Sequence, residues 1–363
     1  MATPRLGILT LYMNDQRTLE EKPVYEKMTV AGQQMGIDIF VFTPDDVNYS
    51  KDRIHALFYN THKKTWRRQW TTFPNAIYDR CRLQKSERFQ RLQKFRRHYG
   101  NVTFLNRPLR NKWTIHNAFM KEPKFRSFMP STKLVNHLSD IIQMLQKFPI
   151  IYLKPISGTG GRGIIRIEKR RNGLLYIQGR NQQRGIITPR QITLSSLGAF
   201  LSTWNLRSTR YIVQQGLDLK LNNGLVHDYR MLVQKNGLGE WKVTGCAGRV
   251  GAKGSITSNL HGGGKAIPMN ELLRIWFKDD FKLEAIKQQI NWFGEEAAKY
   301  LEKTYGSLCE LAFDLAIDKD GKIWMIEVNP KPAREVFIRA GEHAVYEQAI
   351  AKPLEYALWL LQK

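Results

Sequence analysis

The sequence predicts a mixed α/β and α+β protein, and three features indicate this class. Strands and helices alternate over roughly the first hundred residues, strand-like segments dominate from about residue 150, and a long amphipathic helix precedes an Asp-Gly hairpin near the C-terminus. A chain of 363 residues has room for about two domains or three small ones. Its 42% apolar content is enough to build cores, which excludes a disordered chain.

Residues 1–105 are expected to form a small α/β domain. Apolar runs predict strands at 6–12, 37–43, 76–79 and 102–105, and the periodicity between them predicts helices at 22–35 and 83–100. The first helix stops before Gly36, a residue that suits the left-handed position after a helix. Strands that alternate with helices favour a parallel sheet.

Residues 106–216 are expected to form a second unit that is rich in strands. The pattern predicts helices at 112–120, 139–147 and 197–205, and strands at 150–154, 163–168, 174–178 and 211–214. Asn172-Gly173 stands between two alternating runs, which is a strong signal for a β-hairpin.

Residues 217–363 are expected to form a third unit. Strands are predicted at 228–234, 241–250, 311–317 and 322–328. The clearest helix in the chain is 284–305, which Gly306 ends. A last helix over 346–361 contains Pro353, so we expect it to be broken or kinked.

Positive charge is concentrated in one part of the chain. The formal net charge is +25, and residues 61–112, called the basic stretch below, hold 15 lysines and arginines but only two acids. An amphipathic helix with a solvated basic face is the favoured explanation. The aromatic residues Trp66, Trp70 and Phe73 also suit stacking on a single strand. No finger, homeodomain or RNP signature accompanies them, so we do not expect a nucleic-acid partner.

Targeting and cysteine patterns predict a cytoplasmic protein. The N-terminus lacks the charged and apolar regions of a signal peptide, and no apolar run is long enough to cross a membrane. The three cysteines are far apart, which argues against a disulfide scaffold or a zinc module. Cys246 and Cys309 lie in apolar strands and are expected to be buried and inert.

A glycine-rich loop follows the strand at 150–154. The sequence KPISGTGGRG places Lys154 at the end of that strand and then four glycines, Gly158, Gly160, Gly161 and Gly163. A dinucleotide fingerprint requires a helix after the glycines, whereas a hairpin follows here. Two interpretations stay open, a loop whose backbone amides cradle phosphates and a mobile surface loop.

The hairpin FDLAIDKDGKIWMIEVNP (313–330) carries acidic residues at matched positions. A two-residue turn at Asp320-Gly321 places Asp314 opposite Glu327, with Asn329 on the same face. A three-residue loop would break this match. Two opposed carboxylates repel each other, so a cation should lie between them. That cation is either Mg²⁺, which prefers such oxygen ligands, or a nearby Arg or Lys, and the spacing favours the metal.

Six separated motifs together resemble the ATP-grasp superfamily. They are Lys112 in NKWTIHNAFM, PST at 130–132, KPISGTGGRG, QQG at 214–216, DYR at 228–230 and IEVNP at 326–330. The likeness covers residues 106–363, and the domain before them resembles the small Rossmann-like pre-ATP-grasp domain. YDR at 78–80, HDYRMLV at 227–233 and SNLHGGGKA at 258–266 resemble a narrower group, the YheC/YheD family of endospore coat-associated proteins, and the length suits its YheC type.

The resemblance implies a site in which two α+β subdomains, 106–216 and 217–363, clasp ATP with Mg²⁺. Lys112, Lys154 and the glycine loop would contact the nucleotide. The hinge residues Gln214, Gln215 and Leu217 would meet adenine through backbone groups, and Asp218 would meet the ribose. Asp314, Glu327 and Asn329 would hold Mg²⁺. Arg249, Asn259 and Arg230 stand where relatives contact phosphate or substrate.

The resemblance implies ligase chemistry, in which an unknown and perhaps acidic carboxylate substrate is joined to an amine or thiol through an acyl-phosphate. The alternative is a non-catalytic ATP-binding or structural spore-coat protein with other coat proteins as partners. A weaker alternative is a polyanion binder that uses the basic stretch. Arg80 is the candidate substrate contact of the first domain, and a solvated charge is the competing interpretation.

Overall fold

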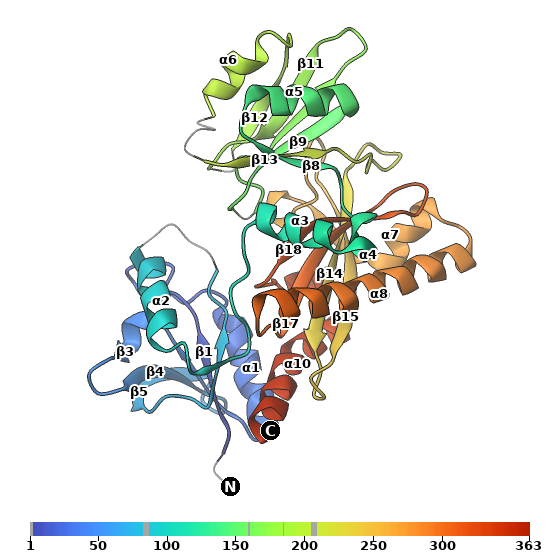
Figure 1. Ribbon diagram of the computed structural model, residues 1–363. Helices are drawn as coiled ribbons and strands as arrows, with labels where there is room; N and C mark the ends of the chain where they lie inside the picture. Colours follow the sequence, from blue (N-terminus) through green and yellow to red (C-terminus); the bar gives the residue numbers. More distant parts are fainter. Residues whose placement is uncertain (1–2, 83–86, 159, 184, 205–208) are drawn as a thin grey trace.

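The computed structural model describes residues 3–82, 87–158, 160–183, 185–204 and 209–363. Its strands form three sheets, and each sheet lies within one of the three ranges predicted from the sequence (Figure 1). The first sheet lies in the blue N-terminal part, the second in the green part, and the third in the yellow to orange part (Figure 1).

The N-terminal sheet has the strand order β3-β4-β2-β1-β6-β7, with β5 paired to β4. Parallel pairs join β1 to β2, β1 to β6 and β6 to β7, as predicted. The pairs β2–β4, β3–β4 and β4–β5 are antiparallel, so the sheet is mixed and the prediction of a parallel sheet holds only for β1, β2, β6 and β7. Its strands are β1 (Arg5–Leu9), β2 (Asp38–Phe42), β3 (Val47–Asn48), β4 (Arg53–Asn60), β5 (Thr65–Thr71), β6 (Ala76–Asp79) and β7 (Thr103–Phe104). Its helices are α1 (Lys22–Gln34), the short η1 (Pro44–Asp46) and α2 (Glu87–His98).

The basic stretch contains one helix and most of one hairpin. Helix α2 buries Leu92 and Phe95 under a basic outer face, as predicted, while 83–86 of the predicted helix lie outside the described residues. The β4–β5 hairpin was not predicted. At least seven basic residues of the stretch pair with carboxylates: Arg68, Arg80, Arg82, Arg88, Arg91, Arg96 and Lys112. Much of this charge therefore serves internal contacts.

The second sheet is antiparallel, with the order β12-β11-β10-β9-β13-β8. Its strands are β8 (Thr132–Val135), β9 (Ile150–Pro155), β10 (Ile165–Lys169), β11 (Leu175–Arg180), β12 (Ile186–Ile192) and β13 (Tyr211–Gln215). Helices α5 (Leu138–Lys147) and α6 (Leu197–Ser202) cover one face, where Leu153, Ile165 and Ile177 form a core with Ile141 and Leu201. Strand side chains alternate, so their neighbours in sequence lie on the opposite face.

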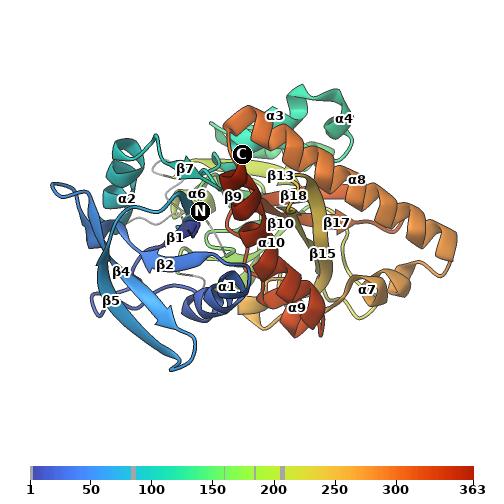
Figure 2. The ribbon, with the colours of Figure 1, turned by 90° about the horizontal axis from the view of Figure 1, so that it is seen from below.

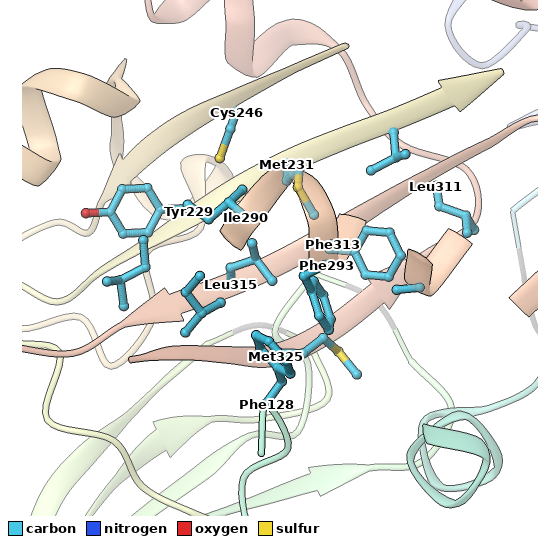
Figure 3. Packing of buried hydrophobic residues seen from close by; sticks show 14 of the residues in the cluster. Phe128, Tyr229, Met231, Cys246, Ile290, Phe293, Leu311, Phe313, Leu315 and Met325 are labelled. Atoms are coloured by element: carbon cyan, nitrogen blue, oxygen red, sulfur yellow. The ribbon is translucent and has the colours of Figure 1, made fainter. Parts of the chain in front are cut away.

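The third sheet is also antiparallel, with the order β16-β15-β14-β17-β18. Its strands are β14 (His227–Lys235), β15 (Trp241–Val250), β16 (Lys265–Pro268), β17 (Glu310–Ile317) and β18 (Ile323–Asn329), and η2 (Leu260–Gly262), α7 (Met269–Trp276), α8 (Asp280–Tyr305) and α9 (Glu335–Arg339) complete the unit. Figure 3 shows its core, in which Phe293 and Ile290 of α8 pack against Phe313 and Leu315 of β17.

Two packing contacts cross the predicted domain limits. Helices α3 (Lys112–Lys121) and α4 (Pro123–Arg126) share the core of α8, where the ring centroids of Phe125 and Phe293 are 5.9 Å apart. Helix α10 (His343–Gln362) packs on α1, and both views show them adjacent (Figures 1 and 2). The C-terminal helix thus ties the first and third sheets together.

Helix α10 continues through Pro353 as one helix, so the expected break is wrong. Proline has no N–H, which leaves the carbonyl of Ala349 without its usual helical donor. That carbonyl accepts instead from Arg334 Nε at 2.8 Å and from Gln234 Nε2 at 3.0 Å. Side chains outside the helix therefore satisfy the group that proline leaves free.

A fully buried ion network joins the N-terminal domain to β17. Both Arg80 and Arg334 pair with Glu310, and the Tyr78 hydroxyl donates to the same carboxylate at 2.5 Å. Arg80 also pairs with Glu21 at 2.7 Å. Although burial disfavours the charged carboxylate, Arg334 and Arg80 hold the pKa of Glu310 below its ordinary value. The competing interpretation of Arg80 as a solvated charge is wrong, because its side chain is buried in this interface. Its guanidinium is bound to Glu21 and Glu310, which does not favour the predicted substrate contact either.

All three cysteines are buried, which confirms the expected burial of Cys246 and Cys309, and burial raises the pKa of both thiols, which disfavours the reactive thiolate. Among the described residues, we find no helix with the length and apolar character that crossing a membrane requires.

Candidate functional site

The β17–β18 hairpin presents the predicted acidic face, although its turn differs from the prediction. Asp314 pairs with Glu327, and Ala312 pairs with Asn329, as a two-residue turn would give. The loop between Ile317 and Ile323 has five residues, however, so the register near the tip is shifted by one. A bulge at Ile326 absorbs that shift. The odd loop and the bulge together return Glu327 to the position opposite Asp314.

Asp314 is held by two arginines of the neighbouring strands. Arg230 Nε donates to Asp314 Oδ1 at 2.5 Å, and Arg249 Nη2 lies 3.0 Å from Oδ2. Although burial favours the neutral acid, these two guanidinium groups keep the pKa of Asp314 below its ordinary value. The arginine alternative for the compensating cation is therefore present in the structure.

Arg249 is also anchored by a second acid, Asp228. Two hydrogen bonds of 2.7 and 2.6 Å join its guanidinium to that carboxylate across the β14–β15 pair. Burial lowers the pKa of Arg249, but Asp228 and Asp314 more than offset this and raise it. Asp228 was quoted only as part of the DYR motif, and its anchoring role was not predicted.

Lys112 connects the glycine loop to the acidic hairpin. It begins α3, whose N-cap is Asn111, and its ammonium donates to the Gly158 carbonyl at 2.7 Å. The same nitrogen lies 3.2 Å from Glu327 Oε1. Residues from three separate motifs of the sequence thus meet at one point.

The glycine loop has the backbone that its composition predicts. Gly158, Gly160, Gly161 and Gly163 all have positive φ, between 66° and 154°, a range that favours glycine. A Cβ on Gly163 would lie 2.5 Å from Gln182, so a larger residue would also be crowded there. The loop joins β9 to β10, beside Lys154.

Lys154 lies on the face of the second sheet opposite α5 and α6. Its ammonium donates to Gln214 Oε1 at 2.6 Å, and Gln214 Nε2 donates to Thr132 Oγ1 at 3.0 Å. Burial lowers the pKa of Lys154 to about 8, against the opposing effect of Glu327 and Asp314. The Gln214 side chain therefore orients a lysine.

The remaining hinge residues are less closely associated with this group. Gln215 is bound to Ser131 through its backbone N–H at 2.8 Å and its side-chain oxygen at 3.2 Å. Leu217 is half-buried. Asp218 is exposed, and its partner is Lys319 at the hairpin tip, 3.4 Å away. The described contacts do not bring Asp218 to the lysines and carboxylates.

Asn259 lies in the loop between β15 and β16, and this loop reaches the glycine loop. A Cβ on Gly161 would lie 3.0 Å from Asn259 Nδ2. The Tyr152 hydroxyl of β9 donates to the Ile256 carbonyl at 3.5 Å. Segment 251–264 of the third unit therefore touches the second unit beside the predicted phosphate-binding loop.

The acidic face fits a magnesium ion by the chemistry of its donors. Asp314, Glu327 and Asn329 offer two carboxylates and a carboxamide oxygen on one face of adjacent strands. The buried Asn329 Nδ2 has no hydrogen-bond partner in the described structure and, as a donor, suits a phosphate oxygen rather than the cation. Among all the residues that the structure describes, no group of three or more His, Cys, Asp or Glu side chains could hold a metal. Phosphate oxygens and water would have to complete the coordination shell.

A surface groove of about 380 Å³ lies elsewhere, in the N-terminal domain between α1, β2 and the β4–β5 turn. It is lined by residues such as Gln33, Tyr59 and Arg67, and it contains none of the predicted site residues.

Comparison with known proteins identifies a family and two named relatives. A family model described as YheC/D-like ATP-grasp matches residues 101–360. The endospore coat-associated protein YheC of Bacillus subtilis (strain 168) is 29% identical over 339 residues, which cover 91% of this chain and 90% of that protein. YheD of the same strain is 28% identical over 369 residues, which cover 99% of this chain and 79% of that protein.

Solved structures of ATP-grasp ligases and related enzymes share the fold. D-cycloserine synthetase DcsG superposes with a TM-score of 0.55 at 12% identity and covers 99% of both chains. The macrocyclase MdnC from Microcystis aeruginosa MRC, bound with its precursor peptide MdnA, gives 0.53 at 12% identity and covers 99% of this chain and 100% of its own. These likenesses confirm the predicted ATP-grasp fold.

Proposed function

Because the chain belongs to the YheC/D-like ATP-grasp family, we propose that it is a ligase that binds Mg-ATP between its two α+β subdomains. One observation carries this proposal. Lys112 contacts both the Gly158 carbonyl and the Glu327 carboxylate, so the phosphate-binding loop and the acidic hairpin lie within reach of one ligand.

The nucleotide would be bound along the second sheet. Backbone groups of 214–217 would meet adenine, as the resemblance implies, because the Gln214 side chain is already bound to Lys154. Asp218 would reach the ribose only by leaving its exposed contact with Lys319, which costs little. Lys112, Lys154 and the backbone amides of the glycine loop would surround the phosphates.

Asp314, Glu327 and Asn329 would hold a Mg²⁺ ion, which supplies charge neutralisation at the β- and γ-phosphates. Arg249 and Arg230 lie on the same face and would stabilise the charge that develops on the transferred phosphoryl group. Asn259 would add a neutral donor from the opposite loop.

The reaction would proceed in two steps. A carboxylate oxygen of the acid substrate attacks the γ-phosphorus and ADP leaves, which gives an acyl-phosphate. An amine or thiol then attacks the acyl carbon, loses its proton, and displaces phosphate, so that a C–N or C–S bond forms. The net charge of +25 would favour an acidic substrate.

A second candidate is a protein that binds ATP without turnover and serves in the spore coat. The contact of Asp314 with two arginines favours it, because both carboxylate oxygens already have partners. The names of YheC and YheD describe coat-associated proteins, so other coat proteins would be the partners.

Calorimetric titration of ATP with and without Mg²⁺ tests the nucleotide site. We expect the wild type to bind Mg-ATP, and we expect Glu327→Gln to lose the Mg²⁺-dependent part of the affinity, about tenfold or more. Glu284→Gln, on the exposed part of α8, is the matched control. If the wild type binds no ATP, the ligase proposal fails. If the wild type binds Mg-ATP, release of ADP in the presence of an acid and an amine would distinguish the ligase from the non-catalytic coat protein.

A further inference from the structure

Arg180 is a buried arginine to which the structure assigns no protein partner. It ends β11, and only 9% of its surface is exposed. Among the described residues, no carboxylate or other acceptor binds its guanidinium. The other arginines buried to this degree all have ion pairs: Arg80, Arg166, Arg249 and Arg334. Most of this side chain is buried, yet its guanidinium has no counter-charge among the described residues, so a binding role explains it better than a structural one.

The position of Arg180 relates it to the proposed nucleotide site. Its backbone N–H donates to the Ile164 carbonyl at 2.8 Å, and the next residue, Ile165, pairs with Leu153. Arg180 is therefore level with Lys154, two strands away, at a backbone separation of about 10 Å. Both side chains project on the face opposite α5 and α6, because Leu153 and Ile177 occupy the covered face and lie an odd number of residues from Lys154 and Arg180 on the same strands.

The far side of Arg180 is covered by the loop that carries Asn259. A Cβ on Gly262 would lie 2.4 Å from Arg180 Nη2, so glycine leaves the space that the guanidinium fills. In the same loop, Asn259 approaches Gly161. The Arg180 guanidinium thus lies at the junction of the second and third units, near the glycine loop.

We propose that Arg180 binds an anionic oxygen group of the ligands, in a subsite between β11 and the Gly262 loop. This inference rests on the proposed function and extends it. The hinge at β13 and Arg180 on β11 lie on opposite sides of β9 and β10, so a nucleotide anchored at the hinge directs its phosphates towards Arg180. The group is either the terminal phosphate of ATP or a carboxylate of the second substrate.

Calorimetry on three variants tests the subsite. Mg-ATP and Mg-ADP are titrated into the wild type, Arg180→Gln and Gly262→Ala, and inorganic phosphate and glutarate are titrated with and without Mg-ADP. A loss of tenfold or more for Mg-ATP, with Mg-ADP unchanged, supports the terminal phosphate. Unchanged nucleotide affinity, with a similar loss for phosphate or glutarate, supports the second substrate.

Gly262→Ala should reproduce the loss without unfolding the protein, because the three atoms nearest to its new methyl group all belong to the movable end of Arg180 and the backbone of Gly262 is not left-handed. Arg190→Gln removes the same charge from the exposed strand β12 and is the control. If Arg180→Gln keeps all four affinities within twofold of the wild type, the subsite is overturned. If the wild type binds no nucleotide, the proposed function is refuted but the Arg180 subsite is not, because the titrations of phosphate and glutarate still test it.

Discussion

Strand β17 holds two buried carboxylates, four residues apart, in contrasting surroundings. Glu310 is fully buried, and its partners Arg80 and Tyr78 come from the N-terminal domain, whereas Arg334 follows β18 and Gln234 lies on the neighbouring strand β14. Asp314 is 6% exposed, and its partners Arg230 and Arg249 belong to the same sheet. The neighbour of Asp314 on β18, Glu327, keeps 27% of its side chain exposed.

This difference separates a structural carboxylate from one suited to a ligand. Arg334 and Gln234 bind one oxygen of Glu310, and Tyr78 and Arg80 bind the other, so both oxygens have partners only when the N-terminal domain is docked. Near Asp314 the charged groups of both signs include Lys112 and Glu327, which are half-exposed, so a ligand can reach them. One strand therefore carries both the contact with the N-terminal domain and a residue of the proposed metal site.

The largest expected effect is the loss of the Glu310 charge. Glu310→Gln removes the acid that the buried Arg80 and Arg334 share, so the free energy of unfolding should fall by about 3–5 kcal/mol. Urea denaturation measures it. Glu284→Gln removes an exposed acid and should change stability by less than about 0.5 kcal/mol. A loss below about 1 kcal/mol in Glu310→Gln would contradict the structural role.

Asp314→Asn should have a smaller effect on stability and a larger one on ligand binding. Arg249 keeps Asp228 as a partner, so we expect a loss of about 1–3 kcal/mol in the free energy of unfolding. The Mg²⁺-dependent part of ATP binding should disappear. Denaturation and calorimetry on the same preparation compare the two effects, and the contrast fails if this variant is as unstable as Glu310→Gln with unchanged ATP binding.

The smallest expected effect is the pH dependence that Lys154 introduces. Burial lowers the pKa of Lys154 to about 8 in the folded protein, whereas its ordinary pKa in the unfolded chain is 10.5. Between these values the unfolded state binds more protons, so stability should rise with pH. Lys154→Met should lose this contribution, which melting temperatures from pH 7 to 10.5 detect. An equal dependence of the melting temperature on pH in both proteins would refute the assignment. The ATP affinity of the wild type should also fall above pH 8, where Lys154 loses its charge.

The sequence predicted local elements well and long-range partners poorly. Helix 284–305 and the hairpin strands were found because their periodicity is local. The β4–β5 hairpin was missed because Arg68 stands between Trp66 and Trp70 in β5 and interrupts the apolar alternation. The burial of Arg80 was not predictable, since Glu310 lies 230 residues away.

The candidate site shows the same limit. The hairpin argument put Asp314 opposite Glu327, and the structure agrees, but the odd loop and the compensating bulge at Ile326 were not visible in the pattern. The arginine partners of Asp314 were predicted only as a class. Arg180 was missed altogether, because no motif surrounds it and its significance comes from the lack of a partner.

Proline at position 353 has a consequence for anyone who would stiffen the C-terminal helix. A carbonyl oxygen has two lone pairs, and that of Ala349 gives both to Arg334 and Gln234. An alanine in place of Pro353 would improve helix propensity but would add a third donor that competes for the same oxygen. A substitution chosen to strengthen one helix would therefore weaken two contacts that anchor this helix within the third unit, and helix propensity alone would misjudge its effect.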